Sequence, residues 1–103
     1  MELFLKDIER YSSSLNDAEL SRVKDFGIKC FKFFEESHGA DIDFRLDNRT
    51  FEIEIVFDNN QITIKKASIF WEILRFTDGC EIRHNIEEPD LCSIVFEICY
   101  SEE

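Results

Sequence analysis

Cysteine and histidine side chains are the first residues of this 103-residue chain to test for chemistry, because they bind metal ions. Cys80 and His84 lie four residues apart, and Cys92 follows later in the chain. On a strand, residues four apart share a face but are separated by about 13 Å, which is too far for one tetrahedral ion. The chain contains no CxxC or HxxxH pair. We therefore expect no metal site and no cofactor.

A cysteine nucleophile would need a histidine base, and the chain has only His38 and His84. No motif joins either histidine to a cysteine. Cys30 and Cys92 have apolar neighbours, among which a free cysteine behaves as a small hydrophobic residue. His38 precedes Gly39, a pair that is typical of a helix end. We therefore expect no catalytic cysteine.

Glu52 and Glu54 lie on the same side of a predicted strand, about 7 Å apart, a separation that the acid and base of a hydrolase use. No supporting motif or group of sugar-stacking aromatic residues accompanies them. The three glycines are isolated, so they form no Gly-rich phosphate loop. We predict that the chain is not an enzyme and that these two carboxylates belong to a surface.

Net charge separates this chain from most small domains. Twelve basic and 23 acidic residues give a net charge of −11, and residues 40–103 carry −9 of it. Phosphates repel such a surface, so direct binding to nucleic acid or to an anionic membrane is disfavoured. A basic partner is favoured by electrostatic steering. Glu87, Glu88 and Asp90, which surround Pro89, form either a solubilising loop or an acidic knob that enters a basic cleft.

Helical spacing marks the first part of the chain. Apolar residues recur at three- and four-residue intervals over Glu2–Leu15, which predicts a helix. Asn16 and Glu19 have the spacing of a capping box at the start of a second helix, which Gly39 would end. Gly27 lies on the apolar stripe of that helix and indicates a close crossing.

After Gly39 the apolar period changes to two, which predicts strands around 42–46, 51–57, 62–65, 80–86 and 91–100. Residues 67–77 are interpreted as a further strand apolar on both sides, with a short helix as the alternative. Asp78-Gly79 predicts a hairpin turn. The expected fold is one α+β domain, in which residues 1–39 form two helices that pack on one face of an antiparallel sheet of about five strands formed by residues 40–103.

Location follows from what the sequence lacks. It shows no secretory signal and no apolar run long enough to span a membrane. Its four cysteines, Cys30, Cys80, Cys92 and Cys99, have no framework spacing. We expect a cytoplasmic protein with reduced thiols.

In size, acidity, α+β pattern and lack of catalytic residues, the chain resembles the small acidic immunity proteins of bacterial toxin systems, including contact-dependent growth inhibition and polymorphic toxins. The resemblance implies a protein that binds one basic toxin, such as an RNase or DNase domain, and covers its active site. The expected partner-binding residues are Glu52, Glu54, Trp71, Asp78, Glu81, Glu87, Glu88, Asp90 and Glu97.

Three alternatives stay open. In the first alternative, the chain is a phage-type nucleic-acid mimic. In the second alternative, it is an enzyme with an unfamiliar site. In the third alternative it is a small structural, oligomerisation or adaptor domain with a merely solvated acidic face. Open strand edges, Trp71 or Tyr100 would then mediate homo-oligomer formation.

Overall fold

The computed structural model describes residues 1–12, 15–47, 50–58, 67–84, 87 and 91–99. Within these residues the elements are α1 (Glu2–Tyr11), α2 (Asp17–Glu36), β1 (Asp41–Leu46), β2 (Thr50–Asp58), α3 (Ala67–Phe76), β3 (Gly79–His84) and β4 (Leu91–Cys99). The four described strands form one antiparallel sheet in the order β1-β2-β4-β3. The α+β class is therefore confirmed. No described helix is long and apolar enough to cross a membrane.

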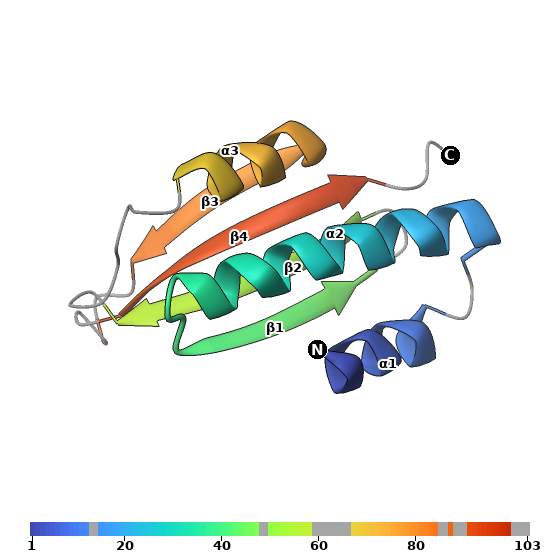
Figure 1. Cartoon of the computed structure of the whole chain (residues 1–103), viewed down its shortest axis with the longest axis horizontal. Helices are drawn as coiled ribbons and strands as arrows, with labels where there is room; N and C mark the ends of the chain where they lie inside the picture. Colours follow the sequence, from blue (N-terminus) through green and yellow to red (C-terminus); the bar gives the residue numbers. More distant parts are fainter. Residues whose placement is uncertain (13–14, 48–49, 59–66, 85–86, 88–90, 100–103) are drawn as a thin grey trace.

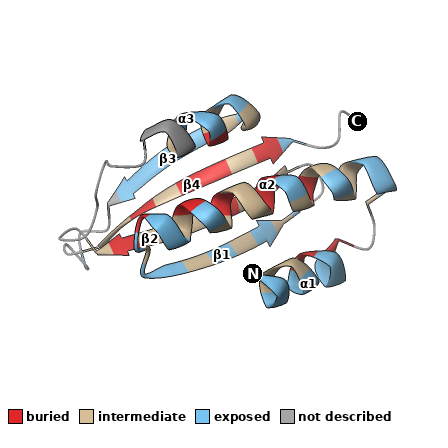
Figure 2. Cartoon of the chain, in the orientation of Figure 1, coloured by how far each residue is buried: buried red, intermediate tan, exposed pale blue. Residues whose placement is uncertain are grey.

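The three helices lie on the same side of the sheet (Figure 1). The ring of Phe33 on α2 lies 5.9 Å from that of Phe57 on β2 and 6.0 Å from that of Phe96 on β4. On α1, Phe4 lies 5.8 Å from Phe44 of β1, and on α3 Phe70 lies 5.9 Å from Phe96. The burial pattern in Figure 2 follows this layering, with the buried positions of β2 and β4 beneath α2.

The alternation of β2 sets the core. Four of its residues, Phe51, Ile53, Ile55 and Phe57, are fully or almost fully buried and face the helices. The residues between them point to the opposite side because successive strand residues alternate. The helices supply the other half of the core with Ile8, Val23, Phe26, Cys30, Phe33 and Ile73.

Two predicted features of the helices are confirmed. Asn16 and Glu19 form the capping box, since Glu19 N–H donates to Asn16 Oδ1 at 2.8 Å and Asn16 N–H donates to Glu19 Oε1 at 3.1 Å. Gly27 marks a close crossing, because a Cβ there would lie 2.8 Å from Cδ1 of Ile8 on α1. The first helix ends earlier than predicted, at Tyr11 rather than at Leu15.

The end of α2 differs from the prediction. His38, not Gly39, adopts the left-handed conformation, with φ of 56°. Gly39 N–H donates to the carbonyl of Phe34 at 2.9 Å, and His38 N–H donates to that of Glu35, which is the Schellman pattern. Gly39 is needed for close packing instead, because a Cβ there would lie 2.5 Å from the Phe34 ring.

The strand interpretation of residues 67–77 is wrong, and the alternative of a short helix is correct. Phe70, Ile73 and Leu74 have the spacing of one helical face, and all three pack into the core region. Asp78-Gly79 follows a helix, so it does not form the predicted hairpin turn. Four described strands replace the expected five, and residues 40–103 include α3. The predicted strand at 62–65 lies outside the described residues.

Candidate protein-binding face

The side of the sheet opposite the helices is called the open face here, and no described helix covers it. The name covers the three rows that cross all four strands, in which the pairing places eleven side chains: Asp41, Asp43, Arg45, Glu52, Glu54, Val56, Glu81, Arg83, Ser93, Val95 and Glu97. Six of these are acidic and two are basic, so the open face carries a net charge of −4. The predicted residues Glu52, Glu54, Glu81 and Glu97 are thus brought together from three strands.

Strand register sets the neighbours on the open face. Glu52, on β2, lies between Arg45 of β1 and Glu97 of β4, and Gly79 of β3 pairs with Glu97 on the far side. Two carboxylates therefore lie directly opposite each other on adjacent strands, an arrangement that destabilises a sheet. The glycine beyond them leaves Glu97 without a side-chain neighbour in its row on β3.

Arg45 bridges two of the carboxylates. Its Nη2 lies 3.0 Å from Oε2 of Glu52, and its Nη1 lies 3.0 Å from Oε1 of Glu54. Burial alone would raise the pKa of Glu54, but hydrogen bonds with Arg45 and Ser93 outweigh it and lower the pKa. The hydrogen bond with Glu54 is also the main cause that raises the pKa of Arg45. Arg45 therefore holds Glu54 ionised and orients both glutamates.

Arg83 acts similarly on β3. Its Nε lies 3.1 Å from Oε1 of Glu81, two residues away on the same strand. This hydrogen bond lowers the pKa of Glu81 and raises that of Arg83. Three of the six acids on the open face are therefore paired with arginines. Among the described residues, no ion pair involves Asp41, Asp43 or Glu97.

Glu97 has the most unfavourable surroundings of these acids. Burial raises its pKa most, followed by the charge of Glu52 and a hydrogen bond with it, with smaller contributions from Asp47 and Asp78. Next to it lies a shallow hollow of about 180 Å³, lined by Glu52, Gly79, Cys80, Glu81, Arg83, Val95 and Glu97. A cation from outside the chain would relieve this repulsion if its charged group entered the hollow.

The middle of the open face is closely packed. Val95 is only 4% exposed and Ser93 only 8%, although both lie on the uncovered side. Val95 is paired with Glu54 on one side and Glu81 on the other. The open face is therefore a charged layer, and the hollow beside Glu97 lies on it.

Asp78 and Trp71, which were also predicted to bind the partner, are not part of the open face. Asp78 precedes β3, and its Oδ2 accepts hydrogen bonds from Cys99 N–H at 2.7 Å and from Arg22 Nη2 at 3.2 Å. It thus ties α2 to the end of the sheet. Trp71 is on α3 and is 61% exposed. Glu87 is exposed, and Glu88 and Asp90 lie outside the described residues.

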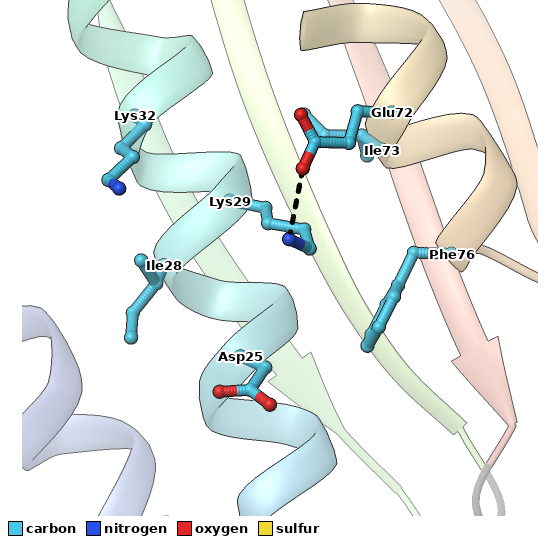
Figure 3. A pocket seen from close by; sticks show the side chains of 7 residues that line it. All are labelled: Asp25, Ile28, Lys29, Lys32, Glu72, Ile73 and Phe76. Carbon is cyan, nitrogen blue, oxygen red and sulfur yellow. Dashed lines mark hydrogen bonds and ion pairs between the residues drawn. The ribbon is translucent and has the colours of Figure 1, made fainter.

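A second hollow, of about 370 Å³, lies between α2 and α3 and is lined by Asp25, Ile28, Lys29, Lys32, Glu72, Ile73 and Phe76 (Figure 3). Lys29 reaches across it, with its Nζ 3.2 Å from Oε1 of Glu72 and 5.7 Å from the centroid of the Phe76 ring. These contacts hold α3 against α2. No group of three metal-binding side chains occurs among the described residues.

Comparisons with family models, curated proteins and solved structures gave no match to the chain. The functional argument therefore depends on the geometry of the open face alone.

Sequence reasoning did not assign roles to Arg45, Asp41 and Asp43. All three lie on β1 beside the predicted carboxylates of β2. The alternation of polar and apolar residues over 41–46 could have identified them, because it places all three residues on the polar side of the strand. Their partners depend on the register, which pairs Leu46 with Phe51 and brings Arg45 opposite Glu52.

Proposed function

We propose that the chain is an acidic inhibitor, of the immunity-protein kind, that binds a basic protein through the open face. The partner is proposed to be a toxin with nuclease activity, and the site of action the cytoplasm. The chain itself is proposed to have no catalytic activity, so inhibition would come from covering the partner's active site.

One observation carries this proposal: six of the eleven side chains on the open face are acidic and only two are basic, and no described helix covers them. The open face has a net charge of −4, whereas all of residues 1–39, which include α1 and α2, have a net charge of −2. A sheet face that is only solvated would not require this excess of acidic over basic side chains. A nuclease cleft, which attracts phosphates, presents the opposite charge.

The open face suits a cationic partner in two ways. Glu97 and the hollow beside it provide an uncompensated carboxylate for a lysine or arginine side chain. Glu52 and Glu54 are held in place by Arg45, so they lose little side-chain freedom on binding. Carboxylates fixed in this manner can take the place of nucleic-acid phosphates in a basic cleft.

The alternative of a merely solvated face also has an observation in its favour, which is that Arg45 and Arg83 neutralise part of the charge. Under that alternative, Asp43 and Glu97 have no functional role. The nucleic-acid mimic differs from the toxin inhibitor only in its target, so identifying the partner separates those two.

The test uses the double variant Asp43→Lys and Glu97→Lys. Each new lysine faces a glutamate across the strands, Glu54 and Glu52 respectively, so the fold is expected to be retained. Tagged wild-type and variant proteins are used to capture partners from lysate of the source cell. The captured protein is then purified and its nuclease activity is measured with increasing inhibitor.

The expected result is a basic nuclease that wild type inhibits at a one-to-one ratio and that the double variant inhibits at least about 100-fold more weakly. The matched control is Glu87→Lys with Asp90→Lys, which makes the same change in net charge on the loop. Equal inhibition by wild type and the open-face variant would reject the open face. A loss confined to the loop variant would move the site to the loop.

A further inference from the structure

We propose that the chain also binds a second copy of itself, through antiparallel pairing of the outer edge of β3 with β3 of that copy. The pairing is centred on Ile82 and joins the two four-stranded sheets into one continuous sheet. This inference does not depend on the inhibitor proposal, because it concerns the edge of the sheet and not the open face.

The edge strand β3 is regular and exposed. It pairs with β4 at six consecutive positions without a bulge, and its sequence contains no proline. Its outer side has no partner among the described strands. Cys80, Glu81, Ile82 and Arg83 are all exposed, and Figure 2 shows this exposure along the strand. A straight edge without proline or bulge is the kind that pairs with another strand.

The charge pattern of β3 is complementary to itself. When two copies pair antiparallel about Ile82, Glu81 lies opposite Arg83 of the second copy, and Arg83 lies opposite its Glu81. The two-fold axis passes between the two Ile82 side chains, which are 69% exposed in the single chain and would contact each other. Two opposite-charge pairs therefore flank one apolar contact.

The other edge of the sheet lacks this complementarity. On β1, the register that brings Asp41 opposite Arg45 of a second copy also places Asp43 directly opposite Asp43. The comparison assigns self-association to β3 and leaves β1 as an edge protected by aspartates.

Among the described residues, the middle of β3 is accessible to a second copy. Phe70 of α3 contacts Phe96 of β4, with ring centroids 5.9 Å apart. Ile82, on the helix side of β3, is 69% exposed. The side chain at the centre of the proposed pairing is therefore accessible, and the open faces of both copies stay uncovered in the pair.

The experiment exploits the symmetry of the two charged positions. Glu81→Arg places two like charges opposite each other in each half of the pair, and so does Arg83→Glu, so each variant alone should be monomeric. When the two variants are mixed, every arginine faces a glutamate again, and a heterodimer should form. Both side chains are exposed, so each variant should fold as the wild type does, which circular dichroism and urea unfolding check.

Sedimentation equilibrium of the purified chain measures the association up to about 1 mM, because a single strand edge is a small interface. We expect a reversible wild-type dimer, a weakening of at least about tenfold in each variant, and recovery in the mixture. A wild type that stays monomeric, variants that dimerise as well as wild type, or a mixture that stays monomeric would each overturn the inference.

Discussion

At the scale of single residues, Glu97 is the residue whose surroundings are hardest to explain by folding alone. It faces Glu52 across the sheet, and burial together with that charge raises its pKa. Glu54, two residues from Glu52, has the opposite situation, because hydrogen bonds with Arg45 and Ser93 lower its pKa despite burial. The ionised Glu54 carboxylate therefore stabilises the fold, whereas the ionised Glu97 carboxylate destabilises it. A group that a fold tolerates at a cost is a candidate for binding.

This contrast gives a matched pair of substitutions. The folded-state pKa of Glu97 is raised, so its ionisation costs stability as pH rises above the ordinary glutamate value of about 4.3. Glu97→Gln should therefore increase the free energy of unfolding at pH 7, by no more than about 0.5 kcal/mol because solvent screens the repulsion. The gain should disappear below the ordinary value, where Glu97 is protonated. Urea unfolding at pH 7 and in mild acid measures both.

The control Glu54→Gln should have the opposite sign. The folded-state pKa of Glu54 is lowered, so its stabilisation is present above the ordinary value and is lost as pH falls toward the lowered one. The substitution should cost about 0.5–1 kcal/mol at pH 7. If both substitutions changed the free energy of unfolding in the same direction, the roles assigned to these two carboxylates would be contradicted.

At the scale of elements, the C-terminal end of α2 has a histidine at a position where glycine would fit the backbone conformation better. His38 adopts φ of 56°, which costs a side chain other than glycine about 1–2 kcal/mol. His38→Gly removes that cost but adds flexibility to the unfolded chain. We expect a net gain of about 0.5–1 kcal/mol in the free energy of unfolding, measured in urea. His38→Ala, which keeps the cost, should stay within about 0.5 kcal/mol of wild type, and an equal gain in both would contradict the left-handed geometry.

The elements also show how far sequence patterns predict this fold. The capping box of Asn16, the close crossing at Gly27 and the alternation of β2 depend on local residues, and the structure confirms all three. The strand interpretation of residues 67–77 is wrong because an apolar segment of this length fits a two-sided strand as well as the short helix that was the alternative. The choice depends on contacts with α2 and β4, which lie far away in the sequence.

The candidate site was predictable to the same extent. Alternation alone placed Glu52, Glu54 and Glu97 on the polar side of their strands. Strand order and register decide which of them meet, and neither can be derived from periodicity. For that reason the opposition of Glu52 and Glu97, and the bridge formed by Arg45, became visible only in the assembled sheet.

At the scale of the whole molecule, the charge distribution separates the two layers. Residues 1–39, which include α1 and α2, have a net charge of −2, whereas the open face alone has a net charge of −4. In the proposed dimer the two open faces would lie side by side on one continuous sheet, which would double the charge that a basic partner meets. The inhibitor proposal and the dimer proposal are thus compatible, although each stands without the other.

The association rate of the chain with its basic partner tests the central claim most directly. Stopped-flow mixing would compare wild type with the Asp43→Lys and Glu97→Lys variant at low salt, about 20 mM, and at about 500 mM, where the Debye length falls severalfold. We predict that the wild-type rate falls at least about tenfold at high salt, and that the variant is slow at both concentrations. A wild-type rate that is independent of salt and equal to that of the variant would contradict the claim that the open face binds this partner.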